Sequence, residues 1–459
     1  MMWYRGKPPS SRFDTAMKRR DFLAAGLSVP LLARWSISAE PTLVSITQQK
    51  IEPYNEDLAF LDDLRRRCYR YFLDASHPTT GLVSDRGATD GSRFSRHASS
   101  AACGFGLAAH SVAAKSGLTP RHDALNRVRI MLDSLLNQVD HERGFLYHFF
   151  STSDGSRSGP CEASSIDTAI LICGAMTAAT EFSEDASITA MTEDLYRRVD
   201  WQWMLGKNDL MHMGWTPEKG MLPHQWDSYS ELLLLLLVAI GAPAQAIPPR
   251  CWNAWRREPV VEFGGRQFLG YPPLFVHQYP FAFFDFRGHR SASGRNYWQN
   301  AVIAHEAQID FMEALGKTHP DRFGHYGTNL WGLTSSDSVD GYRDWGGPYQ
   351  SGRIEPERGI DGTIVPSAAA GGLSIVPEAA LRTLRFQVET YGERAYGPYG
   401  FVNAYNPATQ WIGPDVIGID TGISLLMAEN LISGGVWESF MAHPSAKRAF
   451  DLAGFVSVS

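Results

Sequence analysis

The chain has 459 residues, 44% of them apolar, and its 42 lysines and arginines against 49 acidic residues give a formal net charge of −7. This composition excludes extensive disorder, because the apolar content is sufficient for a large core. The acidic balance argues against nucleic acid and other polyanions as partners. The length allows about two or three average domains, or one large domain such as a closed barrel of helices.

The first residues have the pattern of an export signal. Arg19-Arg20 precede an apolar stretch over 22–33, and a small-x-small site follows it. The Arg-Arg-x-Phe-Leu core resembles a twin-arginine signal, and Met17 could be the true start. The alternative is a surface helix with a basic beginning. We therefore expect a signal region at 1–39, one domain at 40–459 and a periplasmic or secreted protein.

The rest of the chain has no pattern of a membrane span. Its longest apolar stretch, 232–242, is shorter than the ~20 residues that a span needs. The five cysteines are odd in number and lack Cys-x-x-Cys spacing, so neither a zinc knuckle nor a redox pair is indicated. One disulfide remains open at this point.

Helices are expected to dominate the chain and to come in pairs. Apolar residues recur at helical spacing in most of the chain, for example over 56–72. The further predicted helices are 98–116, 121–138, 163–182, 185–206, 228–241, 295–315, 377–391 and 421–432, with a last pair near 434–452. Long loops separate them at 77–97, 142–162, 207–227, 258–294 and 326–376. Ordered loops of such length are usually functional.

Two motifs resemble known functional motifs, but each lacks a feature that the known function requires. Residues 104–109 match the dinucleotide pattern G-x-G-x-x-A, but they lie inside a helical pattern with no strand before them, which favours close helix packing. His305-Glu306 begins like a zinc-protease helix, yet position 309 is Ile309 and the second imidazole is missing. A G-x-S-x-G elbow and a phosphate-binding loop are also absent from the sequence. Nucleotide, zinc-protease and α/β-hydrolase chemistries are therefore disfavoured.

Acidic residues precede or open several apolar helices. Glu231 stands directly before the run that begins at Leu232, where a buried carboxyl could serve as a general acid or could simply complement the helix terminus. Asp167 fits a capping box with Ser164, whereas Glu162 has no evident capping partner. Asp420 opens another apolar helix and could also be only a cap. Acetal hydrolysis requires such a pair of carboxyl groups.

A polar and aromatic tract at 274–288 has the composition of a sugar cleft. His277, Gln278, Asp285 and Arg287 alternate there with aromatic residues. The alternative is that Asp285 and Arg287 form a local ion pair that holds a long loop.

Seven segments in chain order resemble the glycoamylase-like family, which includes glycoside hydrolase family 144, the β-1,2-glucanases. They are Ser-Ile-Asp-Thr-Ala at 165–169, Tyr-Ser-Glu at 229–231, Pro-Leu-Phe-Val-His-Gln-Tyr at 273–279, Trp-Gly-Leu-Thr-Ser-Ser-Asp at 331–337, Asp-Gly-Thr-Ile-Val-Pro at 361–366, Tyr-Gly-Phe-Val-Asn-Ala-Tyr-Asn at 399–406 and Gly-Ile-Asp-Thr-Gly at 418–422. The sequence departs from the family at Asn403, where Asp is expected, and at Thr421, where many relatives have Gln.

The resemblance implies an all-α fold, an (α/α)6 toroid whose long loops form a cleft. It implies inverting hydrolysis of β-1,2-glucan without a metal or cofactor, with Glu231 as general acid and Asp420 and Glu162 in the cleft. Asp420 would help a water molecule attack, directly or through a relay. The expected substrate-binding residues are Asp167, Trp226, Tyr229, His277, Gln278, Tyr279, Asp285, Arg287, Trp331, Asp337, Asp361, Asn403 and Trp411.

Three other functions remain open at the level of sequence. The first is an exo-acting β-glucooligosaccharide hydrolase, on this or another linkage. The second is a periplasmic carbohydrate-binding protein that has lost catalysis. The third is a polysaccharide lyase on a similar toroid, which the acidic balance disfavours because a lyase usually has to neutralise uronates.

Overall fold

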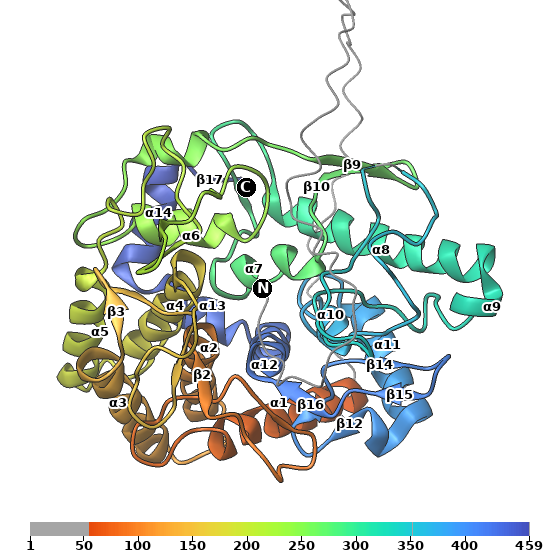
Figure 1. The fold of residues 1–459 in the computed structure, drawn as a ribbon, viewed down its shortest axis with the longest axis horizontal. Coiled ribbons are helices and arrows are strands. Elements are labelled where there is room, and N and C mark those ends of the chain that lie inside the picture. The colour runs from red at the N-terminus through yellow and green to blue at the C-terminus, as the bar shows by residue number, and fades with distance from the viewer. Residues whose placement is uncertain (1–54, 351, 459) are drawn as a thin grey trace, which may run out of the picture. The chain divides into compact units, whose positions relative to one another are not determined.

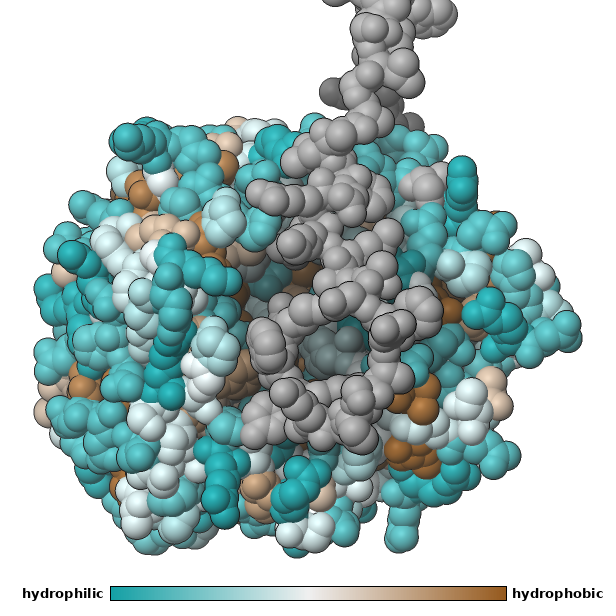
Figure 2. All heavy atoms as spheres, viewed as in Figure 1, coloured by the Kyte–Doolittle hydropathy of each residue, from teal (hydrophilic) through white to brown (hydrophobic). Residues whose placement is uncertain are grey.

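The computed structural model describes residues 55–350 and 352–458, so the predicted export signal lies outside the described residues. Helices dominate the described chain, as the sequence predicts (Figure 1). None of the described helices is both long and apolar enough to cross a membrane. On the face that Figure 2 shows, hydrophobic residues lie in small groups among hydrophilic ones.

One set of helices is apolar on nearly every side. Almost all their residues are buried, and a helix that is apolar all round has to be surrounded by protein. These apolar helices are α2 (Ser100–Lys115), α4 (Ser165–Glu181), α6 (Leu232–Ile240), α7 (Tyr279–Phe283), α10 (Pro366–Ala370) and α12 (Gly418–Ile432).

A second set of helices is amphipathic. Each buries one face and exposes the other, with most of the charged residues on the exposed side. These amphipathic helices are α1 (Asn55–Asp74), α3 (Arg121–Asn137), α5 (Ala186–Arg198), α8 (Tyr297–Thr318) and α11 (Pro377–Tyr391). The remaining helices are short: α9 (Pro320–Phe323), α13 (Gly435–Met441), α14 (Pro444–Ala453) and the 3-10 turns η2 (Pro249–Asn253), η3 (Leu274–His277) and η4 (Gly392–Arg394).

The two sets alternate along the chain and pack as layers. The apolar helices contact one another in the order α10, α12, α2, α4, α6 and α7, and α7 contacts α12 again. The amphipathic helices cover them, with α1 against α12 and α2, α3 against α2, and α5 against α4. The apolar helices therefore form the core of the fold.

The loops between the helices carry short antiparallel strands. Most pair in twos, and β6, β7 and β8 form a three-stranded sheet. The strands are β1 (Arg86–Ala88), β2 (His97–Ser99), β3 (His141–Glu142), β4 (Phe145–Leu146), β5 (Phe149–Ser151), β6 (Ala163–Ser164), β7 (Gly214–Thr216), β8 (Gly220–Met221), β9 (Val260–Phe263), β10 (Arg266–Leu269), β11 (His289–Arg290), β12 (Tyr396–Gly397), β13 (Gly400–Phe401), β14 (Tyr405–Asn406), β15 (Trp411–Ile412), β16 (Asp415–Ile417) and β17 (Val456–Ser457).

The structure differs from the sequence prediction in three elements. The helix expected over 185–206 ends at Arg198, because the backbone of Val199 is extended. The short helices α7 and α10 lie within the stretches expected to be loops, and each has a proline in its first turn. All five cysteines are free, so the open disulfide does not form.

Candidate active site

Three of the predicted acids lie at the beginnings of apolar helices. Asp167 and Asp420 are the third residues of α4 and α12, and Glu231 immediately precedes α6. At the other ends of two apolar helices, the side-chain amide of Asn430 in α12 donates to the carbonyl of Ala282 in α7 over 2.9 Å. The C-termini of α7 and α12 therefore lie together, and their N-termini face the same side of the fold.

Tyr279, the first residue of α7, connects the three acids. Burial raises the pKa of its hydroxyl well above the usual range, and the negative charges of Asp420, Glu231 and Asp167 raise the pKa further. Because such effects weaken with distance, all three acids lie near enough to this hydroxyl for their charges to act on it. We call Asp167, Glu231 and Asp420 the acid cluster.

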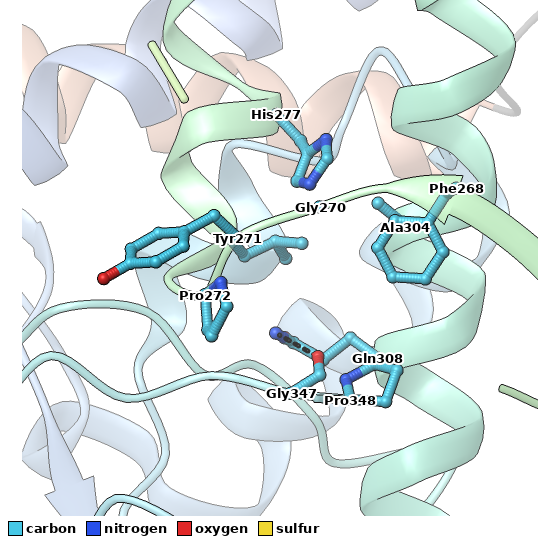
Figure 3. Close-up of a pocket in the computed structure, with 10 residues that line it drawn as sticks. Phe268, Gly270, Tyr271, Pro272, His277, Ala304, Gln308, Gly347 and Pro348 are labelled. Carbon is cyan, nitrogen blue, oxygen red and sulfur yellow. Dashed lines mark hydrogen bonds between the residues drawn. The ribbon is translucent and has the colours of Figure 1, made fainter. Parts of the chain in front are cut away.

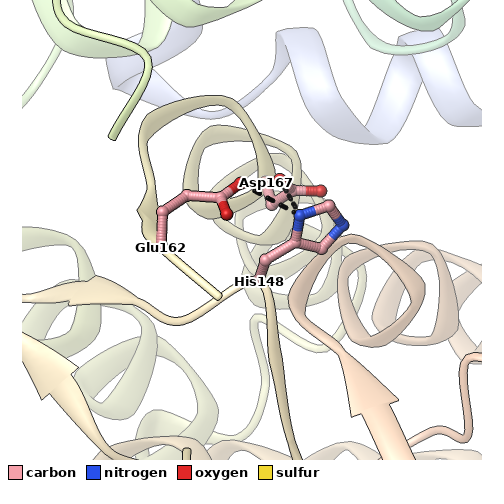
Figure 4. Close-up of side chains that lie close together, drawn as sticks. All are labelled: His148, Glu162 and Asp167. Carbon is pink, nitrogen blue, oxygen red and sulfur yellow. Dashed lines mark hydrogen bonds and ion pairs between the residues drawn. The ribbon is translucent and has the colours of Figure 1, made fainter. Parts of the chain in front are cut away.

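Beside the acid cluster, His148 lies between two carboxylates (Figure 4). Its Nδ1 lies 3.1 Å from Oε1 of Glu162 and 3.7 Å from Oδ2 of Asp167. Burial opposes the charged imidazolium, but the two carboxylates outweigh that effect and raise the pKa of His148 to about 9. Burial also opposes ionisation of Glu162, and the bond from His148 nevertheless lowers the pKa of this carboxyl. Glu162 is therefore an anion at neutral pH.

Asp167 has two roles in this arrangement. Its backbone N–H bonds to the hydroxyl of Ser164 over 3.3 Å, as the predicted capping box requires, and that hydroxyl lies 2.5 Å from Oδ2 of Asp167. The ligand atoms of His148, Glu162 and Asp167 lie within 4.8 Å of one another, a spacing that a metal ion could bridge. An imidazolium has no lone pair at Nδ1, so metal binding would first require His148 to lose its proton.

Asp420 has neutral rather than cationic partners. The side-chain amide of Asn403 donates to its Oδ2 over 2.6 Å. Burial raises the pKa of Asp420 to about 7, although Asn403 favours the charged form. The side chain is still partly exposed, so solvent and small molecules can reach it.

Asn403 is bonded to Asp337, and Asp337 is bonded to Arg86. The side-chain oxygen of Asn403 accepts from the backbone N–H of Asp337 over 2.8 Å, and Arg86 binds Oδ2 of Asp337 over 2.8 Å. Burial raises the pKa of Asp337, and Arg86 partly offsets that effect. Arg86 also lies 3.7 Å from Asp415, so one guanidinium joins β1 to β16 and to the loop at 337.

Glu231 lies at the N-cap of α6, with its side chain half-buried. Its side chain makes no bond to the first N–H groups of that helix, so capping is not its role. The neighbouring Trp226 is buried and donates its indole N–H to the hydroxyl of Ser165 over 2.9 Å. This bond fixes the loop before α6, which leads to Glu231, to the beginning of α4, which carries Asp167.

Several predicted substrate-binding residues are buried and have protein partners. The hydroxyl of Tyr229 lies 3.0 Å from Nδ1 of His277, and burial lowers the pKa of His277 well below its usual range. The amide of Gln278 donates to the carbonyl of Ala368 over 2.7 Å and lies 3.0 Å from Nε2 of His305. Trp331 is fully buried. In the described structure these side chains support the helices that carry the acids.

Of the other predicted site residues, Asp285 and Arg287 lie away from the acid cluster. Asp285 and Arg287 form the local ion pair that the sequence allowed, at 2.8 Å, and Arg287 also stacks 3.8 Å from the ring centre of Trp437. They follow the C-terminus of α7, the end opposite to the acids. Asp361 accepts a bond from the backbone N–H two residues later, and Trp411 is half-buried in β15.

A small pocket lies between β10, η3 and α8 (Figure 3). Polar and apolar atoms contribute about equally to its lining, with His277 on one side and the Gln308 amide on the other, and its cavity volume is about 10 Å³. None of the acids contributes to it, so it is separate from the acid cluster.

Sequence reasoning did not find His148 or Arg86. The sequence held only an indirect indication of His148. Glu162 precedes the capping box without a capping partner, which is consistent with a cationic partner from elsewhere in the chain. Arg86 lies about 250 residues from Asp337 in the chain, and no local pattern joins them.

The comparisons with known proteins agree with these features. The family model described as "Glycoamylase: Putative glucoamylase" matches residues 223–444, which confirms the resemblance to the glycoamylase-like family. An exo-β-1,2-glucooligosaccharide sophorohydrolase of Parabacteroides distasonis is 24% identical over 438 residues, which cover 86% of this chain. The match spans only 58% of that relative's length.

Solved structures share the fold over most of the chain. A protein described as a putative glucoamylase from Bacteroides uniformis has a TM-score of 0.79 at 25% identity, covering 88% of this chain and 99% of its own. An endo-β-1,2-glucanase from Chitinophaga pinensis has a TM-score of 0.77 at 22% identity, covering 87% of this chain and 99% of its own.

Proposed function

We propose that the helices form an (α/α)6 toroid, in one catalytic domain that spans residues 40–459. Amphipathic and apolar helices alternate as α1–α2, α3–α4, α5–α6, α8–α10 and α11–α12, with α7 as the sixth apolar helix. The contacts of α12 with both α2 and α7 support closure of the apolar helices into a ring. The N-termini of that ring would then surround the cleft.

We further propose that the protein is an inverting glycoside hydrolase that cleaves β-1,2-glucan or its oligosaccharides. The observation that carries this proposal is that Asp167, Glu231 and Asp420 lie at the beginnings of three apolar helices of one core, and that the charges of all three act on the buried Tyr279. Acetal hydrolysis needs carboxyl groups with unlike protonation at one place. The substrate is inferred from the relatives, one named as a β-1,2-glucooligosaccharide hydrolase and one as an endo-β-1,2-glucanase.

In this mechanism Glu231 donates a proton to the glycosidic oxygen as the bond to the anomeric carbon breaks. Asp420 accepts a proton from the water molecule that attacks that carbon from the opposite face, so the configuration inverts. A carboxylate with a pKa near 7 is a stronger base than an ordinary one, and the raised pKa of Asp420 suits this role. Glu162 stays ionised and stabilises positive charge that develops on the sugar ring.

Exo action is the second candidate, because the curated relative is named as an exo-acting enzyme and the structural neighbour as an endo-acting one. The loop at 326–376 is the element that would decide between them, by closing one end of the cleft or leaving it open. We also propose that the protein is exported to the periplasm or beyond by the twin-arginine route. Its partner is then an extracytoplasmic carbohydrate.

The test is product analysis of the purified protein on linear β-1,2-glucan, with laminarin, cellulose oligomers and starch as other substrates. Glu231→Gln should lose at least about a thousandfold in turnover, because the amide cannot protonate the leaving oxygen. The matched control is Glu438→Gln, the same change at a side chain that is 74% exposed. It should retain full activity.

The products separate the remaining functions. Intermediate chain lengths early in the digestion indicate endo cleavage, whereas one small product from the start indicates exo cleavage. Unsaturated ends that absorb ultraviolet light would identify a lyase. Binding without any product would leave a carbohydrate-binding protein, and full activity of Glu231→Gln would reject Glu231 as the acid.

A further inference from the structure

The amide oxygen and the amide nitrogen of Asn403 have different partners, so the side chain fits in only one orientation. The side chain is 1% exposed, so both atoms need partners inside the protein. One atom faces the backbone N–H of Asp337 at 2.8 Å, which can only donate. That atom must be the amide oxygen, and the NH₂ group must then face Asp420, at 2.6 Å.

The other charged groups near Asp420 do not supply such a donor. The positive charge of Arg86 favours the Asp420 anion, but the guanidinium forms its hydrogen bond with Asp337. The negative charge of Asp337 disfavours the anion. The remaining titratable groups that interact with Asp420 are Tyr71 of α1, Tyr279 of α7 and Tyr342. Two neutral side chains favour the Asp420 anion, the hydroxyl of Ser367 and the amide of Asn403, and the amide donates to Oδ2 of Asp420 over 2.6 Å.

We propose that Asn403 is a positioning residue: its amide presents an N–H to Asp420, so that the carboxylate forms without a second carboxyl beside it. An aspartate at position 403 would keep the bond from Asp337 but would place carboxyl against carboxyl. Two such groups share one proton and cannot both ionise readily. The catalytic consequence rests on the proposed role of Asp420 as base, whereas the effect on its ionisation does not.

The experiment is Asn403→Asp, which changes shape by almost nothing. In this variant the acidic limb of kcat/KM on β-1,2-glucan should move to higher pH by about one unit or more, because Asp420 ionises later. Its melting temperature, relative to the wild type, should fall as pH rises from 5 to 8, since two anions then face each other. Asn406→Asp is the matched control, because Asn406 is equally buried and donates to the backbone carbonyl of Asp361 instead. The control should leave the acidic limb in place.

The double variant Asn403→Asp/Asp420→Asn exchanges the two groups. An amide N–H at position 420 can then donate to a carboxylate at position 403. At pH 8 the double variant should therefore recover most of the melting temperature that the single variant loses relative to the wild type. An unmoved acidic limb in an active Asn403→Asp enzyme would overturn the proposal, and so would a double variant no more stable at pH 8 than the single one. If the wild type cleaves no glucan, the proposed function fails, and the melting temperatures still decide the role of Asn403.

Discussion

At the scale of single residues, the carboxyl groups of the site differ in pKa because they have different partners. Glu162 bonds to the His148 imidazolium, which lowers its pKa against the effect of burial. The hydrogen-bonding partners of Asp420, the Asn403 amide and the Ser367 hydroxyl, are both neutral, so burial dominates and raises its pKa to about 7. Environments that move two pKa values apart are how enzymes assign different roles to like groups.

The raised pKa of Asp420 also predicts a cost in stability. The folded state holds this proton more tightly than the unfolded state, so stability falls as pH rises from about 3.8 to about 7. Asp420→Asn removes that loss. We expect the variant to be more stable than the wild type by about 2–4 kcal/mol at pH 8, to show little difference at pH 4, and to lose nearly all turnover.

Urea unfolding at both pH values measures this effect. The control is Asp451→Asn, at an exposed position of α14, which should change stability equally little at pH 4 and at pH 8. A variant of Asp420 that is less stable than the wild type at pH 8 would contradict the assignment of its raised pKa.

The sequence predicted the acids but not what holds them. Asp167, Glu231 and Asp420 could be found because a helix N-terminus has a local pattern. His148, Arg86 and Asn403 act across distances in the chain that no spacing rule covers. Tyr229, His277 and Gln278 were assigned to the substrate from composition and from the family resemblance, and neither of these predicts the bonds that the three side chains make within the protein.

At the scale of elements, α2 and α4 pack with their backbones almost in contact. A Cβ built on Gly174 would lie 2.0 Å from the carbonyl oxygen of Gly104, and one built on Gly104 would lie 2.6 Å from the Cα of Leu171. The structure thus confirms the prediction that the dinucleotide-like glycine pattern at 104–109 serves helix packing. The short α7 and α10 escaped prediction because they have too few residues to show helical periodicity.

We therefore expect Gly174→Ala to destabilise the protein by about 3 kcal/mol or more, since neither backbone can move away without moving a whole helix. The control is Gly327→Ala, because a Cβ there has no heavy atom within 4 Å and the backbone needs no positive φ. That change should be within about 0.5 kcal/mol of the wild type. Thermal unfolding of the two variants compares them directly, and a Gly174→Ala protein as stable as the control would mean that the helices are not in backbone contact.

At the scale of the whole molecule, elements near the N-terminus of the described chain contact elements near its C-terminus. α1 packs along α12, and β1 pairs with β16, so that Arg86 lies opposite Ile417. These contacts connect segments more than 300 residues apart, and sequence periodicity carries no information on them. The number and pairing of the predicted helices and the family resemblance both led to the expectation of a closed arrangement, whereas helix patterns alone do not say which helices meet.

A buried ion pair lies at the centre of this junction. Arg65 of α1 donates to Glu429 of α12, and both side chains are almost fully buried. Arg65→Met leaves an unpaired carboxylate in the interior, which should destabilise the protein by about 3–5 kcal/mol. Arg65→Met/Glu429→Leu removes both charges and should recover much of that loss, because a paired apolar contact needs no desolvated charge.

The exposed pair of Arg197 with Glu193 on α5 is the matched control. Arg197→Met should cost less than about 1 kcal/mol, because solvent screens a pair at the surface. Denaturant unfolding of the three variants and the wild type measures these differences, and each curve should keep a single transition if α1 and α12 unfold with the rest of the domain. An early separate transition in Arg65→Met would show instead that α1 detaches by itself, and the junction would then not be part of the cooperative core.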